Sequence, residues 1–162
     1  MACRTSLEVE HLLAQFRMNQ QDTPLVTPRC ISLDNDWNSK EEVMKGMTDN
    51  LLLAGRCRYP RKLEADLWAR EAVFSTGLGF SFAIPHSKSE HIEQSTISVA
   101  RLKAPVMWGD EEAQFIIMLT LNKHAAGDQH MRIFSRLARR IMHEDFRNAL
   151  VNASSGEAIA SL

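Results

Sequence analysis

The stretch Phe115-Ile116-Ile117-Met118-Leu119-Thr120-Leu121 is a nearly continuous apolar run. A run of this length without polar alternation is typical of a strand that is covered on both faces. Three further segments have strand character: Cys30–Leu33, Thr96–Leu102 and Phe80–Ile84, the last of which alternates up to Pro85. Proline cannot donate a ladder hydrogen bond, so we expect that strand to end there. A sheet covered on both faces needs helices on each side.

Helical patterns separate these strands. Ser39 and Glu42 form a capping box for a helix that Gly55 would end. The apolar stripe of this helix consists of Val43, Met47 and Leu51. One or two short helices are expected at the C-terminus, with Phe146, Leu150, Ala158 and Ile159 as their apolar positions. Strands interleaved with helices predict an α/β fold in which a mixed β-sheet is flanked by helices.

Two helical patterns carry polar residues on an apolar stripe. Pro60 suits a first helical turn, and Arg70 then shares a face with Leu63 and Leu67. A guanidinium on such a face needs an anionic or hydrogen-bonding partner to offset its desolvation, and a structural ion pair would serve as well as a bound ligand. His130 begins the stripe of a later helix, where the positive end of the helix dipole favours an anion.

Composition excludes several classes of protein. The 162 residues, 44% of them hydrophobic, are enough for one compact domain. Nineteen basic residues stand against 20 acidic ones, so no net field would recruit nucleic acid or an anionic membrane. The three cysteines are far apart and suggest neither disulfides nor a sulfur-rich metal site, which predicts a cytoplasmic location. No apolar run approaches the ~20 residues that would insert into a bilayer.

Histidine is the natural candidate for reversible phosphoryl transfer near neutral pH, because neutral imidazole is nucleophilic and its N–P bond stays labile. The chain has six histidines, and most histidines in proteins have surface or structural roles. His86 follows Pro85 at the end of a strand, a layout that presents a side chain at the rim of a sheet. The spacings of His86 with His91 and of His124 with His130 do not place two ligands on one helical face, so no metal site is predicted.

Several motifs occur together in a fixed order. Arg70-Glu71 precedes Ser75-Thr76-Gly77-Leu78-Gly79, which precedes Ala83-Ile84-Pro85-His86. Val106-Met107-Trp108-Gly109, the apolar strand and Gly127-Asp128-Gln129-His130 follow. In order and spacing these motifs resemble the enzyme IIA domains of the mannitol/fructose class in the bacterial phosphoenolpyruvate-dependent sugar phosphotransferase system. The resemblance covers residues 28–162.

This resemblance implies a role for each of three residues. His86 would be the phosphorylated histidine, modified on Nε2; His130 would be the second active-site histidine, and Arg70 would face the phosphate. The implied function is that of a phosphotransferase, which accepts a phosphoryl group from phospho-HPr, or from an HPr-like domain, and passes it to enzyme IIB of a sugar permease. No cofactor and no metal are implied.

Two other functions are compatible with the same residues. A regulatory enzyme IIA-like domain would use the charge of phosphorylated His86 to control a partner protein, and an independent hydrolase would release phosphate from a small substrate without HPr. Members of the family have smaller or more polar residues where this chain has Phe80-Ser81-Phe82. The resemblance therefore does not predict which sugar the system transports. Phe80 and Phe82 could form the rim of a partner surface, although a core position is the more common one for large apolar side chains.

The N-terminal residues carry a separate pattern. Residues 5–17 have the capping box and the periodicity of a short helix, and residues 18–28 read as a linker. The first 17 residues resemble the closing helix of enzyme I of the same system. This resemblance implies that the chain is the C-terminal part of a multiphosphoryl transfer protein, with the enzyme IIA domain at residues 29–162; a free-standing domain with an extra helix is the alternative.

Overall fold

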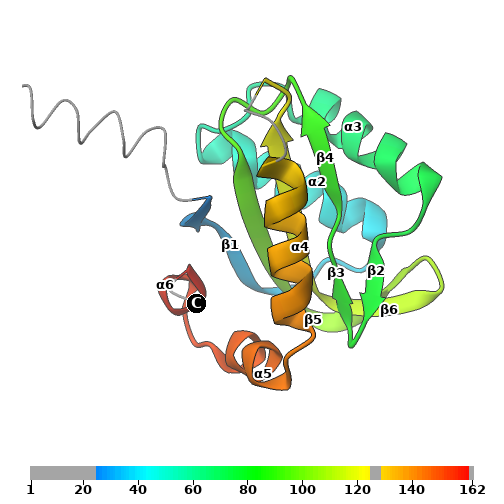
Figure 1. Cartoon of the computed structure of the whole chain (residues 1–162), viewed down its shortest axis with the longest axis vertical. Helices are drawn as coiled ribbons and strands as arrows, with labels where there is room; N and C mark the ends of the chain where they lie inside the picture. The colour runs from blue at the N-terminus through cyan, green and yellow to red at the C-terminus, as the bar shows by residue number, and fades with distance from the viewer. Residues whose placement is uncertain (1–24, 125–128, 161–162) are drawn as a thin grey trace, which may run out of the picture.

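The apolar run Phe115–Leu121 forms the centre of β6 (Glu111–Asn122), the strand around which the sheet is assembled. The computed structural model describes residues 25–124 and 129–160 of the chain. The other elements, shown in Figure 1, are β1 (Val26–Asn35), α2 (Lys40–Leu53), α3 (Pro60–Val73), β2 (Gly77–Gly79), β3 (Phe82–Ala83), β4 (His86–Ser89), β5 (Thr96–Trp108), α4 (Gln129–Ile141), α5 (Glu144–Asn152) and α6 (Gly156–Ala160).

The sheet has six strands and is mixed. Its order is β1-β5-β6-β3-β2, and β4 pairs with β6 as well. β5 and β6 form a long antiparallel hairpin, whereas β1 runs parallel to β5 and both β3 and β4 run parallel to β6. The strands β3 and β4 therefore follow one another along the same edge of β6.

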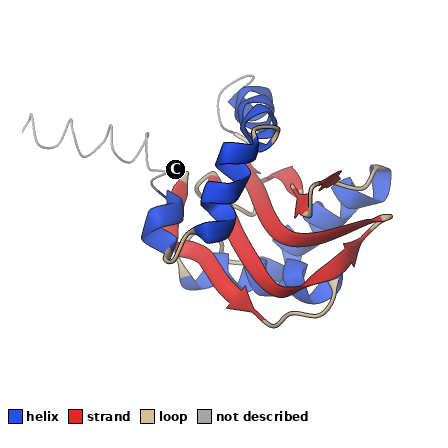
Figure 2. Ribbon diagram, turned by 90° about the horizontal axis from the view of Figure 1, so that it is seen from below, coloured by secondary structure: helices blue, strands red, loops and turns tan. Residues whose placement is uncertain are grey.

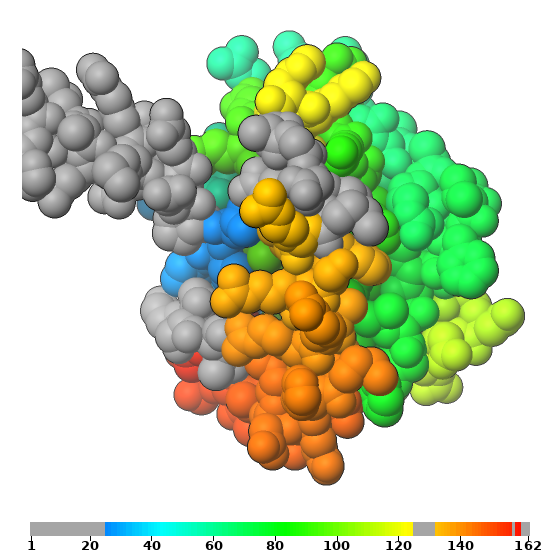
Figure 3. Space-filling model, viewed as in Figure 1, coloured from blue at the N-terminus to red at the C-terminus, as the bar shows by residue number. Residues whose placement is uncertain are grey.

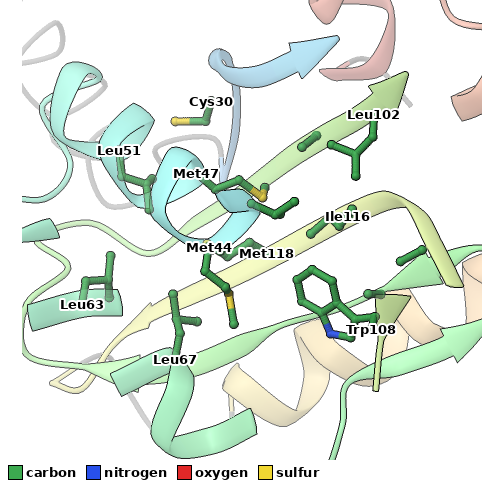
Figure 4. Packing of buried hydrophobic residues seen from close by; sticks show 14 of the residues in the cluster. Cys30, Met44, Met47, Leu51, Leu63, Leu67, Leu102, Trp108, Ile116 and Met118 are labelled. Carbon is green, nitrogen blue, oxygen red and sulfur yellow. The ribbon is translucent and has the colours of Figure 1, made fainter. Parts of the chain in front are cut away.

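Side chains of β6 point alternately into two apolar cores. Ile116 and Met118 lie in the core beneath α2 and α3 (Figure 4), together with Met44, Met47, Leu51, Leu63, Leu67 and Trp108. Phe115, Ile117 and Leu119 lie in the second core, which contains residues of α4, α5 and α6. Figure 2 shows helices on both sides of the sheet. The prediction of a mixed sheet flanked by helices, with this strand covered on both faces, is confirmed.

The helix boundaries predicted between residues 39 and 60 are confirmed. Ser39 is the N-cap of α2, and its Oγ accepts a hydrogen bond of 3.1 Å from the amide of Glu42. Gly55 follows the C-cap of α2 with a φ of 74°, the left-handed conformation in which glycine is favoured. Pro60 is the first residue of α3, and two short helices, α5 and α6, end the described chain.

The predicted strand Phe80–Ile84 is wrong in its limits. Only Phe82 and Ala83 form β3, and the chain does not leave the sheet at Pro85. Pro85 has no amide hydrogen, but its carbonyl accepts from the amide of Leu119 at 2.9 Å. The pairing with β6 therefore resumes at once, and His86 begins β4 rather than standing beyond the end of a strand.

The predicted linker also ends too late. β1 begins at Val26, so residues 26–28 belong to the sheet, because Val26 pairs with Ile97. The predicted helix at residues 5–17 and the linker residues 18–24 lie outside the described part of the chain. None of the described helices is both long enough and apolar enough to cross a membrane.

Phe80 and Ser81 form the two-residue turn of the β2–β3 hairpin. Both have a positive φ, 57° and 67°, as a type I′ turn requires at its two central positions. Asn-Gly is the pair that fits such a turn, because a residue with a bulkier side chain pays roughly 1–2 kcal/mol in the left-handed region. The backbone at Phe80-Ser81 is therefore strained.

Replacing Ser81 with glycine is expected to relieve part of this strain. We expect Ser81→Gly to raise the free energy of unfolding by about 0.5–1 kcal/mol. Glycine adopts a positive φ without strain, and this gain exceeds the cost of the larger conformational entropy that glycine gives the unfolded chain. Urea unfolding measures the change. The control is Ser135→Gly, at an exposed position within α4, which should lower the stability by about 0.5 kcal/mol. Equal losses in the two variants would contradict the turn conformation.

Candidate functional site

His86 is the first residue of β4 and is 8% exposed. Its Nδ1 lies 2.9 Å from the carbonyl oxygen of Ile84. Because a carbonyl oxygen can only accept, this contact assigns the proton of the neutral ring to Nδ1. The lone pair is then on Nε2, the nitrogen that would form a bond to phosphorus.

Arg70, in the last turn of α3, faces this nitrogen. Its Nε–H donates to Nε2 of His86 at 3.2 Å, which agrees with Nε2 as the acceptor. Its Nη1 donates to the carbonyl oxygen of Phe74 at 2.8 Å. Ion pairs between described residues involve Arg58, Arg61, Arg101, Lys40 and His91 but not Arg70. The structure therefore brings Arg70 and His86 together without a carboxylate partner for the guanidinium among the described residues.

The ring of His86 is kept neutral by its surroundings. Burial lowers the pKa of His86 below its ordinary value, and the nearby charge of Arg70 lowers it further, whereas the hydrogen bond to Ile84 and the charge of Glu71 act in the opposite direction. Phe134 of α4 contributes to the burial, with its ring centroid 4.7 Å from that of His86. In the space-filling view α4 lies against the green segment that contains β2 to β4 (Figure 3). A neutral imidazole near pH 7 is the nucleophilic form.

The lowered pKa predicts a pH dependence of stability. In the unfolded chain His86 titrates near its ordinary pKa of about 6.5, so below that pH the unfolded state binds a proton that the folded state does not. The free energy of unfolding should then fall as the pH decreases from the unfolded pKa toward the folded one. Urea unfolding between about pH 7.5 and 5.5 checks this: the wild-type curve should be steeper than that of His86→Gln. Parallel curves would contradict the lowered pKa.

His130 lies in the first turn of α4, as predicted. Its side chain is outside the described part of the structure, so its predicted approach to His86 stays a prediction. Phe134, whose ring contacts His86, comes one helical turn after His130 on the same helix. The path of α4 is thus compatible with the predicted role.

Comparison with known sequences identifies the family of this chain. Over residues 24–162 the chain matches the family "Phosphoenolpyruvate-dependent sugar phosphotransferase system, EIIA 2". The chain belongs to this enzyme IIA family. It is 90% identical over all of its 162 residues to "Multiphosphoryl transfer protein 2" of Escherichia coli (strain K12), and it spans 19% of the length of that relative.

Solved structures have the same enzyme IIA fold. Nitrogen regulatory protein IIA-Ntr from Neisseria meningitidis superimposes with a TM-score of 0.75 at 26% identity, over 85% of this chain and 94% of that one. Enzyme IIAMtl in a complex with phosphorylated enzyme IIBMtl from Escherichia coli superimposes with a TM-score of 0.69 at 18% identity, over 84% of this chain and 94% of that one. The predicted fold, a mixed sheet of the enzyme IIA mannitol/fructose type, is confirmed.

The two phenylalanines of the segment Phe80-Ser81-Phe82 have different environments. Phe82 is buried and its ring is stacked on that of Phe115, with the centroids 5.0 Å apart. Phe80 is 55% exposed, and the guanidinium of Arg147 lies 4.1 Å from its ring centroid. The core prediction is therefore confirmed for Phe82 and wrong for Phe80, because the I′ turn directs Phe80 away from the sheet.

Sequence reasoning missed the polar cluster next to Arg70. Glu71 is buried and contacts Lys40, Thr76 and Trp108. In the sequence, Glu71 and Trp108 are recognisable only as members of the family motifs. A usable signal was present, because Glu71 follows Leu67 by four residues and so falls on the apolar stripe of α3. A carboxylate on such a stripe calls for buried donors.

Proposed function

We propose that this enzyme IIA domain carries a phosphoryl group on Nε2 of His86. The observation that supports the proposal best is the pair of contacts at the imidazole: Nδ1 is bonded to Ile84, and Nε2 is an acceptor that faces Arg70. The ring is thereby held with its nucleophilic nitrogen toward a cationic group. That arrangement suits a site that accepts and then releases a phosphoryl group.

The donor would be phospho-HPr or an HPr-like domain. The lone pair of Nε2 attacks phosphorus and forms the new N–P bond, while the P–N bond to the donor histidine breaks and its electron pair stays on the donor nitrogen. Arg70 releases Nε2 as the phosphorus approaches, and its guanidinium then donates to the phosphate oxygens. The bond from Nδ1 to Ile84 is compatible with both states and keeps the ring in place.

The acceptor would be enzyme IIB of a sugar permease, to which the same steps in reverse deliver the phosphoryl group. The similar fold of enzyme IIAMtl, solved in a complex with phosphorylated enzyme IIBMtl, supports this choice. His130 would donate a hydrogen bond to the phosphate or hold the ring of His86. Phosphoryl transfer between these partners would take place in the cytoplasm.

The relative that is 90% identical supports a place within a multiphosphoryl transfer protein. Residues 1–17 would then be the end of an enzyme I-like domain. The linker would run from residue 18 to the start of β1 at Val26, and the enzyme IIA domain would occupy the rest.

A phosphorylation assay tests the proposal. The chain is incubated with phosphoenolpyruvate, enzyme I and HPr, and then with isolated enzyme IIB. We expect an acid-labile, base-stable phosphate on the chain that disappears when enzyme IIB is added. No label on the chain in the presence of phospho-HPr would overturn the proposal.

A regulatory function is the second candidate, because the similar structure from Neisseria meningitidis is a nitrogen regulatory protein. In that case the chain would be labelled by phospho-HPr but would keep its phosphate when enzyme IIB is added. The second step of the same assay therefore separates a carrier from a regulator.

A further inference from the structure

The carboxylate of Glu71 is the most heavily bonded buried charge near the site. Its side chain is 3% exposed. It accepts hydrogen bonds from the hydroxyl and the amide of Thr76. Nε1 of Trp108 donates to the Thr76 hydroxyl oxygen at 3.0 Å and also lies 3.4 Å from the carboxylate. Nζ of Lys40 lies 2.9 Å away and supplies the opposite charge. A buried carboxylate is tolerated only with such compensation, so removing one donor should disturb the others.

Thr76 connects this carboxylate to His86. The carbonyl oxygen of Thr76 accepts from the amide of Ile84 at 3.0 Å. The carbonyl of the same Ile84 accepts from Nδ1 of His86 at 2.9 Å. The orientation of the imidazole is thus linked, through the backbone of the single residue Ile84, to the position of Thr76.

Thr76 also connects the carboxylate to Arg70. α3 ends at Val73, and Phe74 has an extended backbone with φ −166° and ψ 135°. The carbonyl of Phe74 holds Nη1 of Arg70 at 2.8 Å. The direction of that carbonyl depends on how the chain turns between Phe74 and Thr76, and the bonds from Thr76 to Glu71 close this turn.

We propose that Glu71 and Thr76 are a positioning pair for phosphoryl transfer. The pair fixes the position and orientation of the guanidinium of Arg70 relative to the imidazole of His86. The inference rests on the proposed function of His86. Neither residue touches the reacting atoms: Thr76 acts through the carbonyls of Phe74 and Ile84, and Glu71 acts through Thr76. The pair would set the rate of transfer rather than the affinity for the donor.

Thr76→Val is the direct test, because valine keeps the shape of threonine and removes the hydroxyl that donates to Glu71 and accepts from Trp108. We expect the rate of phosphoryl acceptance at saturating phospho-HPr to fall about 10- to 100-fold, since small misplacements of reacting groups have effects of that size. The phospho-HPr concentration for half-maximal rate should stay within a factor of about three of the wild-type value. Thr76→Ser keeps the hydroxyl and should restore most of the rate.

Thr48→Val is the matched control. Thr48 is buried like Thr76, but its hydroxyl donates to the carbonyls of Met44 and Lys45 within α2 and bonds to no described residue of the site. The Thr48→Val variant should be less stable than the wild type but should accept the phosphoryl group at the wild-type rate per folded molecule. ¹⁵N NMR of His86 measures the tautomer of the ring, which does not depend on the overall stability of the fold. The Nδ1–H tautomer should dominate in the wild type and in Thr48→Val, and both tautomers should be populated in Thr76→Val.

The outcomes separate the positioning role of Glu71 and Thr76 from the proposed phosphoryl transfer through His86. A wild-type rate in Thr76→Val, or an equal slowing in Thr48→Val, would overturn the positioning role and would leave the phosphoryl carrier intact. A wild-type chain that accepts no phosphate would instead overturn the proposed function. Slow transfer in Thr76→Val, with recovery in Thr76→Ser and a normal Thr48→Val, would support the pair.

Discussion

A chain that carries His86→Gln is expected to accept no detectable phosphoryl group from phospho-HPr under conditions that label the wild-type chain fully. Glutamine is similar in size to histidine and polar, but its amide nitrogen has no free lone pair and cannot form an N–P bond. Transfer is measured by the acid-labile label on the chain. The loss is expected to be complete because the described side chains around His86, Arg70 included, offer no other nucleophilic nitrogen.

The control for this variant is His91→Gln. His91 lies five residues further along and its side chain is 25% exposed, so its replacement should leave the label unchanged. Urea unfolding of His86→Gln near pH 7 should show a loss of about 1–3 kcal/mol, because the substitution alters the hydrogen bonds to Ile84 and Arg70 and removes the ring contact with Phe134. Label on a folded His86→Gln chain would mean that another residue is the acceptor.

The strand at Phe115–Leu121 and the helix that starts after Ser39 were predictable because their signals are local. Apolar continuity distinguishes a strand with two covered faces, and a capping serine marks a helix start within three residues. The interruption at Pro85 was not predictable in the same way. A missing amide hydrogen indicates the end of a ladder, but the carbonyl of Pro85 keeps its bond to Leu119, 34 residues away in the sequence. Whether pairing resumes is decided by β6, not by the proline.

The turn at Phe80-Ser81 was missed for a related reason. Phe80-Ser81-Phe82 alternates as a strand does, and no glycine or asparagine occupies the turn itself. The hairpin forms because Gly77 pairs with Ala83 and Gly79 with Phe82, so the surrounding pairing imposes a positive φ on residues that do not prefer it. Tertiary structure overrides local preference here.

At the site, the sequence indicates which residues are unusual but not how they meet. Arg70 on an apolar stripe signals a need for a partner, and the structure supplies Nε2 of His86 and the carbonyl of Phe74. Trp108 reaches Glu71 across 37 residues of sequence. Contacts of this range depend on how α3 lies against β5, which no local pattern specifies.

Arg70→Lys is expected to slow phosphoryl acceptance about 10²- to 10³-fold, the usual effect of removing one aligned donor from a charged transition state. Lysine keeps the positive charge, but a single ammonium cannot bond Phe74 and the phosphate in the way that the planar guanidinium can. The rate at saturating phospho-HPr measures the effect. Arg61→Lys is the control, because Arg61 lies on the same helix and pairs with Asp49 and Glu64 instead.

The same variant should also shift the equilibrium of the transfer. If Arg70 bonds the phosphate oxygens on His86, it stabilises the phosphorylated domain relative to phospho-HPr, so Arg70→Lys should move the equilibrium toward phospho-HPr by about 10-fold, the equivalent of 1.4 kcal/mol. Label partition at equilibrium measures this shift without reference to rate. A slower rate with an unchanged partition would mean that Arg70 acts only in the transition state, and an unchanged rate and partition would remove Arg70 from the phosphate site.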